Sequence, residues 1–131
     1  MTEIRDGWKG SISLEYRYTA GVAGQKYLDG LKKGRILATR CASCGVTYLP
    51  PRIYCERCLS RLDDWVEVKP EGELYSYTVT RTKDGPRVIG LARFDGVEGG
   101  VLAPIRETRK KLELGARARI SLADGRAEIV L

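Results

Sequence analysis

The sequence predicts a mainly β protein in which an N-terminal arm and a short helix precede a small metal-bound ribbon and a five-stranded barrel. Three observations lead to this prediction. Four cysteines form two C-x2-C pairs that are separated by ten residues. Five short runs typical of strands follow Pro70 and are punctuated by glycine. Residues 20–33 place apolar side chains at helical spacing.

The first twenty residues predict an extended arm or strand, because large apolar residues alternate there with polar ones. The apolar residues would share one face: Trp8, Ile12, Leu14, Tyr16 and Tyr18. Neither a ribbon nor a closed barrel requires that face. Two interpretations stay open: the arm covers the chain's own barrel, or it docks on a partner.

A short amphipathic helix is expected over residues 20–33. Its apolar positions recur at helical spacing: Val22, Ala23, Tyr27, Leu28 and Leu31. Gly30 weakens the last turn, and Gly34 is a plausible stop because glycine favours the backbone conformation that ends helices.

The cysteine spacing predicts one tetrahedral metal site built from four thiolates: Cys41, Cys44, Cys55 and Cys58. A strand over residues 36–40 leads into the first pair, and a strand over 65–68 leaves the second. Each C-x-x-C wraps a tight turn, so a hairpin brings four sulfurs to about 2.3 Å from one ion. Gly45 allows a positive φ in the first turn, whereas Leu59 strains the matching place in the second.

Zinc is the expected metal, with iron in the same cage and a pair of disulfides as the alternatives. Four thiolates close the coordination shell and leave no position for water or substrate. The zinc would therefore be structural. It would hold a module of about 35 residues, which is too small to bury a sufficient core by itself.

Five strands are expected beyond Pro70, over residues 73–81, 87–94, 100–105, 116–122 and 126–131. Asp-Gly pairs mark three tight turns, and the charged connection 106–114 is anchored only by Leu112 and Leu114. Strict alternation places Tyr75 and Tyr77 on one face of the first strand. A longer connection after the third strand suits an OB-type barrel. The predicted units are the arm and helix (1–34), the zinc ribbon (35–70) and the OB-fold domain (71–131).

The composition sets limits on function. The formal charge is +6, and a four-thiolate zinc site of charge −2 reduces it to about +4. No histidine is present, so the usual general base near neutral pH is missing and catalysis by this chain alone is not expected. No apolar run reaches the roughly 18 residues that span a bilayer, and the N-terminus lacks the core of a signal peptide. We expect a cytoplasmic protein with no membrane partner.

Residues 20–131 resemble the acyl-CoA-associated zinc-ribbon/OB-fold proteins. The resemblance runs from GLKKGRIL through TRCASCGVTYLPPRIYCERC and a Trp-centred strand to GELYSYTVTRT, and YLPPR at residues 48–52 is its most specific part. It implies a rubredoxin-like ribbon and an OB fold. It also implies an accessory subunit in a hetero-oligomer with a thiolase-like acyl-CoA condensing enzyme, which holds the catalytic residues. Leu59 departs from the family, where a small residue is common.

Four arginines surround the two C-x-x-C turns, called the knuckles below. They are candidates for binding CoA phosphates or for contacting the partner: Arg40, Arg52, Arg57 and Arg61. The other interpretation is a solvated basic rim. In the first interpretation, CoA or acyl-CoA would lie at the partner interface.

The alternative function is a single-stranded nucleic-acid binder, since OB folds often stack bases on aromatic residues of the second and third strands. Here those strands hold only Phe94, with a partial substitute in Tyr75 and Tyr77 on the first strand. We therefore expect no nucleic-acid partner. The acyl group, the partner's identity and the stoichiometry do not follow from the sequence.

Overall fold

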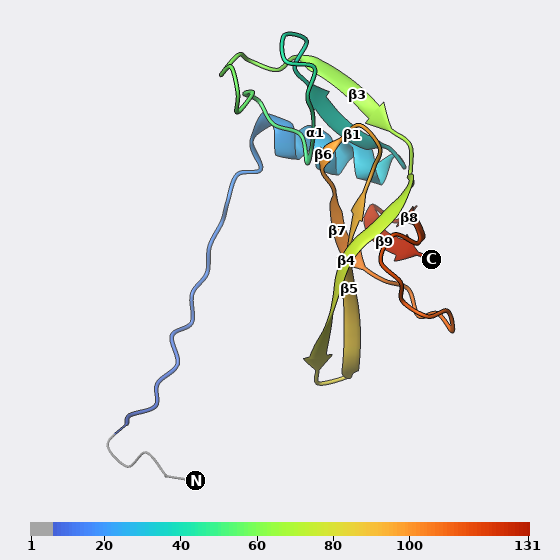
Figure 1. Cartoon of the computed structure of the whole chain (residues 1–131). Helices are drawn as coiled ribbons and strands as arrows, with labels where there is room; N and C mark the ends of the chain where they lie inside the picture. Colours follow the sequence, from blue (N-terminus) through green and yellow to red (C-terminus); the bar gives the residue numbers. More distant parts are fainter. Residues whose placement is uncertain (1–6) are drawn as a thin grey trace.

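The computed structural model describes residues 7–131, so the first six residues of the predicted arm lie outside it. Figure 1 shows the arm leading into the helix, the ribbon above and the barrel below. In chain order the elements are α1 (Gly21–Lys32), β1 (Ile36–Arg40), β2 (Thr47–Leu49), β3 (Asp64–Val68), β4 (Glu71–Thr82), β5 (Gly85–Arg93), β6 (Glu98–Gly99), β7 (Val101–Pro104), β8 (Arg117–Ala123) and β9 (Arg126–Val130). The expected helix and strands lie within two residues of their predicted bounds. The sequence did not predict β2 and β6.

The helix ends at the predicted glycine. Gly34 has φ 77°, its N–H donates to the Leu31 carbonyl, and the Arg35 N–H donates to the Gly30 carbonyl at 2.8 Å. This pair of bonds is the Schellman cap, which satisfies carbonyls that a helix end leaves free. Gly30 is buried where α1 meets the ribbon, and a Cβ there would lie 3.0 Å from the Leu37 side chain. Gly30 therefore allows close packing as well as weakening the turn.

The ribbon sheet has the order β3-β1-β2-β6, and its fourth strand comes from the barrel half of the sequence. β1 pairs antiparallel with β2 and β3, whereas β6 pairs parallel with β2. Gly99 lies opposite Leu49 with φ 91°, and a Cβ on it would collide with the Leu49 carbonyl oxygen. The Gly100 N–H donates to that same oxygen at 2.9 Å. Glycine is thus required where the two modules join.

The barrel sheet has the order β7-β5-β4-β8-β9 and is closed by a parallel bridge between Ile105 and Ile129. This arrangement is the expected five-stranded OB-type barrel. Asp124 and Gly125 both have positive φ between the paired residues Ala123 and Arg126, as a two-residue hairpin turn requires. The outer part of the β4–β5 hairpin extends beyond its neighbouring strands (Figure 1).

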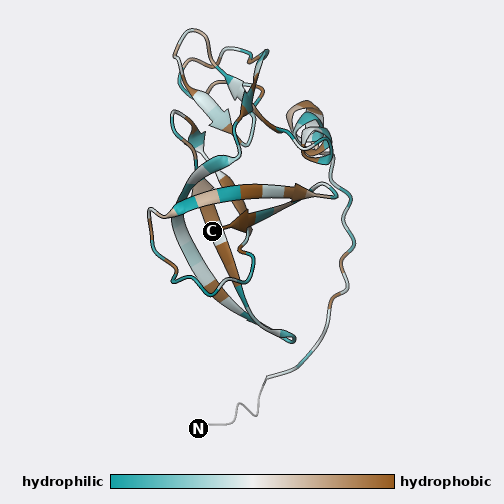
Figure 2. Cartoon of the chain, turned by 90° about the vertical axis from the view of Figure 1, so that its right-hand side faces the viewer, coloured by the Kyte–Doolittle hydropathy of each residue, from teal (hydrophilic) through white to brown (hydrophobic). Residues whose placement is uncertain are grey.

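One hydrophobic core spans both modules. Ribbon residues contribute Ile36, Leu49 and Val68 to the same cluster as barrel residues such as Leu74 and Ile129. Figure 2 shows apolar and polar residues alternating along the barrel strands. A smaller cluster lies at the knuckles and consists of Cys41, Tyr48, Cys55 and Leu62. The ribbon therefore has one end in the common core and one end in a core of its own.

Two local predictions are wrong. A bulge between Leu74 and Ser76 shifts the register of β4, so Tyr77 lies opposite Gly90 while Tyr75 lies beside Arg93. A bulge turns successive side chains out of strict alternation, so the two tyrosines do not share a face.

The second wrong prediction concerns the connection between β7 and β8. Leu112 packs against the core, but Leu114 is 65% exposed and anchors nothing.

Candidate functional site

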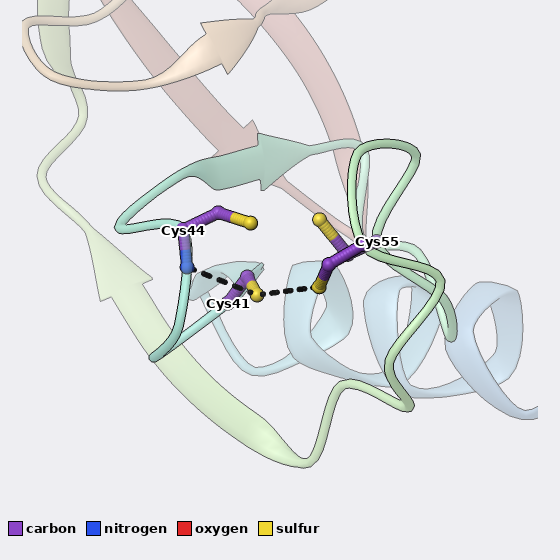
Figure 3. Close-up of side chains that lie close together, drawn as sticks. Cys41, Cys44 and Cys55 are labelled. Carbon is purple, nitrogen blue, oxygen red and sulfur yellow. Dashed lines mark hydrogen bonds between the residues drawn. The ribbon is translucent and has the colours of Figure 1, made fainter.

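The four cysteines converge on one point at the far end of the ribbon. β1 delivers Cys41, and the sulfurs of all four cysteines lie within 4.8 Å of one another. Cys41 Sγ lies 3.6 Å from Cys58 Sγ. Figure 3 shows the sulfurs of Cys41, Cys44 and Cys55 directed toward a shared centre.

The two knuckles have the same backbone geometry. In the first, Gly45 N–H donates to the Cys41 carbonyl at 2.7 Å; in the second, Leu59 N–H donates to the Cys55 carbonyl at 2.9 Å. Gly45 has φ 73° and Leu59 has φ 61°. The predicted positive φ at Gly45 is confirmed, and Leu59 adopts the same conformation despite its side chain. Leu59 therefore carries backbone strain that Gly45 avoids.

The cluster fits a zinc ion. A tetrahedral site with Zn–S bonds of about 2.3 Å separates its sulfurs by roughly 3.8 Å, close to the spacing found. The Cys44 N–H lies 3.4 Å from Cys41 Sγ, and the Arg57 N–H lies 3.4 Å from Cys55 Sγ. Such amide groups stabilise thiolate charge in zinc knuckles. Four thiolates fill the shell, so a zinc ion here would be structural.

Side chains around the cluster distribute its charge. The Tyr48 hydroxyl, 3.3 Å from Cys55 Sγ, lowers the pKa of Cys55 to about 6, and the same contact raises the pKa of Tyr48 to about 12. Ser60, whose Oγ lies 3.2 Å from Cys58 Sγ, lowers the pKa of Cys58. The neighbouring Cys58 sulfur raises the pKa of Cys44 to about 12. The pKa values of Cys55 and Cys58 are thus lowered while the pKa of Cys44 is raised. A bound divalent cation would favour the thiolate form of all four cysteines.

Sequence reasoning did not identify Tyr48 and Ser60 as partners of the metal ligands. Tyr48 is 2% exposed, so it supports Cys55 from inside the knuckle core. The one available signal for Tyr48 was its place in the family-like stretch 48–52.

The four knuckle arginines all form ion pairs on the surface. Arg40 pairs with Asp64 and Arg57 with Glu98, both at 3.9 Å; Arg61 pairs with Asp63 at 3.4 Å and Arg52 with Glu56 at 3.3 Å. Exposed pairs of this kind contribute about 0–1 kcal/mol each. The local positive charge is therefore largely balanced. Their role in binding CoA or a partner stays a prediction.

A buried threonine positions Arg52. Thr39 is fully buried in β1, and its Oγ1 accepts the Arg52 N–H at 2.8 Å. The Arg52 guanidinium then lies 5.3 Å from the centre of the Tyr48 ring. Arg52 is consequently held beside the knuckles by three contacts, with Thr39, Tyr48 and Glu56.

Residues 7–20 of the arm lie free of the barrel in both views (Figure 1 and Figure 2). Its large apolar side chains are exposed: Trp8 90%, Ile12 84%, Leu14 64%, Tyr16 66% and Tyr18 82%. The Tyr16 and Tyr18 rings stack with centroids 5.8 Å apart, as residues on the same side of an extended segment do. In this structure the arm does not cover the chain's own barrel.

The barrel lacks a stacking platform for bases within the described residues. Phe94 is 6% exposed and belongs to the core, so its ring is not accessible. Tyr75 and Tyr77 are exposed but are separated by the bulge. Within residues 7–131, no helix is both long and apolar enough to cross a membrane.

Comparison with known families gives two adjoining matches. Residues 28–64 match the ChsH2 rubredoxin-like zinc ribbon domain, and residues 65–123 match the ChsH2 C-terminal OB-fold domain. Together these models cover most of the chain. Comparison with curated proteins gives no match.

Two solved structures are similar to the chain. One is a DUF35-family protein of unknown function from Sulfolobus solfataricus, with 32% sequence identity and a TM-score of 0.73 over 85% of this chain and 86% of that one. The other is described as an Ltp2-ChsH2(DUF35) aldolase, with 22% identity and a TM-score of 0.66 over 87% of this chain and 96% of that one. At that identity the second likeness concerns the fold alone.

Proposed function

The chain belongs to the ChsH2 (DUF35) family of zinc-ribbon and OB-fold proteins, and on this basis we propose that it is a non-catalytic accessory subunit of a thiolase-type acyl-CoA enzyme. In this role it stabilises a partner that carries the catalytic residues. The description of the Ltp2-ChsH2(DUF35) aldolase, which pairs a family member with an enzyme, supports such a partnership.

The exposed arm is the observation that carries the proposal. Five large apolar side chains project from one unpaired segment, with Trp8 and Tyr18 more than 80% exposed. Leaving so many apolar side chains in water is unfavourable, and a partner groove would bury them. On α1, Val22 and Leu28 are also about half exposed.

The chemistry of the chain supports a role without catalysis. The described cluster of four thiolates leaves no open metal position. The sequence also has no histidine to act as a general base. The knuckle arginines, Arg52 above all, are proposed as interface residues, because arginines often anchor protein interfaces.

Reconstitution tests this proposal. The full chain should co-purify with an acyl-CoA condensing enzyme from its native host and raise that enzyme's condensation or thiolysis rate, while showing no turnover alone. Trp8→Ala with Tyr16→Ala should weaken the complex at least tenfold, because interface energy is concentrated in a few aromatic anchors.

Leu102→Ala is the matched control, since Leu102 is 72% exposed on β7 and lies outside the arm. It should leave affinity unchanged. Turnover of an acyl-CoA by the isolated chain, or full binding by the arm variant, would refute the assigned roles. Tight binding of single-stranded DNA or RNA that persists above about 200 mM salt would instead favour the nucleic-acid alternative.

A further inference from the structure

The second knuckle carries a leucine whose backbone conformation is unfavourable and whose side chain lies in solvent. Among residues 7–131, only Leu59 and Asp124 have positive φ without being glycine. Aspartate visits that region because its short polar side chain can hydrogen-bond locally, whereas a leucine there is strained. Leu59 is 75% exposed and belongs to neither hydrophobic cluster. The packing of the free chain therefore does not explain this leucine.

The first knuckle shows that the turn itself needs no side chain at this place. Gly45 occupies the matching position with φ 73°, and its N–H bonds to the Cys41 carbonyl just as the Leu59 N–H bonds to the Cys55 carbonyl. Glycine thus gives the same knuckle geometry without strain. Strained residues are concentrated where proteins bind ligands or change state. The reason for a leucine at residue 59 is accordingly sought outside the turn.

The residues around Leu59 indicate the kind of surface that would receive it. Tyr54, just before the same turn, is also exposed and is joined to Arg61 by an isolated β-bridge. The charges of this segment are balanced within the chain through three ion pairs: Arg52 with Glu56, Arg57 with Glu98, and Arg61 with Asp63. Apolar side chains with polar residues around them are the usual composition of an interface. The matching surface is therefore apolar, since no excess charge calls for a strongly acidic one.

The backbone that carries Leu59 is fixed before any partner binds. The Cys55 N–H donates to the Ser60 carbonyl at 2.9 Å, and the Leu59 N–H donates back to the Cys55 carbonyl at 2.9 Å. Cys58, a member of the metal cluster, directly precedes Leu59. A segment that is already rigid avoids the ordering cost of binding. The leucine is thus presented to solvent from a preorganised turn.

We propose that Leu59 is an apolar anchor that inserts into an apolar pocket of the acyl-CoA enzyme partner, with Tyr54 in support. This inference rests on the proposed function and adds a second docking point to the arm. Arg52, already proposed as an interface residue, is linked to the same turn through Glu56.

A second copy of the chain is a poorer occupant for this surface. Two exposed side chains supply on the order of 300 Å². A stable interface needs about 800 Å² from each partner. The knuckle must therefore act together with other surfaces of a larger interface, such as the one that the arm would form.

Titration of knuckle variants of the full, zinc-bound chain against the purified enzyme tests the anchor. Leu59→Gly and Leu59→Asn both remove the apolar side chain and suit a positive φ. Both should keep the zinc and be at least as stable as the wild type in thermal melts, yet bind the enzyme at least about tenfold more weakly. Leu59→Met keeps an apolar side chain of similar size and should bind within about threefold of the wild type.

Leu114→Asn is the matched control, because it makes the same change at an exposed leucine on the connection between β7 and β8. It should leave the affinity for the enzyme unchanged. The difference between the wild type and Leu59→Asn should persist at about 0.5 M salt, since salt screens charge pairs and not apolar contacts.

Several outcomes would overturn the anchor: wild-type affinity in both Leu59→Gly and Leu59→Asn, an equal loss in Leu114→Asn, or a loss in Leu59→Met as large as in Leu59→Asn. Loss of zinc or of stability in the glycine and asparagine variants would show that the leucine serves the fold instead. A dimer of the free chain that these variants dissociate would make a second copy the occupant.

The anchor and the proposed function fail in different ways. If the wild type and the Leu59 variants join and activate the enzyme equally, only the anchor is wrong. If the chain binds the enzyme through Leu59 without changing its rate, only the accessory role is wrong. If the wild type associates with no acyl-CoA enzyme, both are wrong.

Discussion

The two ends of the ribbon are stabilised by different forces. At the end facing the barrel, Ile36, Leu49 and Val68 are buried in a core that both modules share. At the far end, the buried residues of the knuckle cluster are Tyr48 and Leu62 besides two of the cysteines, with the partly buried Val46 and Cys44 packed against them. Full burial of an apolar side chain contributes about 1.5–3 kcal/mol, so the knuckle core is too small to hold two turns by itself. The comparison indicates that the metal is needed for one half of the ribbon and not for the other.

Loss of a ligand should have the largest effect. Cys41→Ser should abolish tight metal binding and unfold the knuckles over about residues 41–61, because structural zinc supplies on the order of 10 kcal/mol to such modules. The barrel and β1 should stay folded, since their shared core does not contain the metal. Zinc analysis together with amide hydrogen exchange measures both effects.

Ser43→Ala, in the same turn but without a ligand atom, is the control and should keep the zinc. Global unfolding of the Cys41 variant would show that the two ends of the ribbon are not separable.

The junction of the two modules should be the next most sensitive point. Gly99→Ala places a Cβ against the Leu49 carbonyl oxygen at a residue with positive φ, so we expect a loss of about 2–4 kcal/mol in unfolding free energy. Gly96→Ala is matched, since Gly96 has φ 71° but no neighbour within 4 Å of the added atom. It should cost only about 1–2 kcal/mol of backbone strain. If denaturant melts give the two variants equal losses of unfolding free energy, the contact with the Leu49 carbonyl oxygen is not the cause.

The hydroxyl beside Cys55 should have a smaller effect. Tyr48→Phe removes the group that lies 3.3 Å from Cys55 Sγ while leaving the buried ring in place. Loss of such a supporting contact typically lowers metal affinity about 10–100-fold, which chelator competition measures. Tyr54→Phe is the control, because Tyr54 is 58% exposed. An unchanged affinity in the Tyr48 variant would mean that this hydroxyl does not support the ligand.

The smallest effect is expected from the difference between the knuckles. Leu59→Gly should stabilise the protein by up to about 1 kcal/mol, because glycine adopts a positive φ without strain and the Leu59 side chain is 75% exposed. The reciprocal change Gly45→Ala should destabilise it by about the same amount. Thermal melts of the zinc-bound variants compare the two. A destabilised Leu59→Gly variant would indicate that the leucine makes a stabilising contact.

The sequence by itself determined the features that depend on neighbouring residues. The spacing of Cys41, Cys44, Cys55 and Cys58 was sufficient to predict the cluster, and alternating runs located the barrel strands. Gly34 and Gly45 marked a helix end and a knuckle turn correctly, because both signals act within a few residues.

Only the tertiary structure decided which distant residues meet. The β2–β6 pairing joins residues 48 and 98, and its two short strands carry too little periodicity to be recognised. The bulge in β4, which separates Tyr75 from Tyr77, arises from the register with β5. Likewise, the ion pairs of the knuckle arginines depend on chain folding. Local patterns indicate the face on which a side chain lies wherever strict alternation holds, whereas bulges and neighbours across the fold are set by strand order and packing.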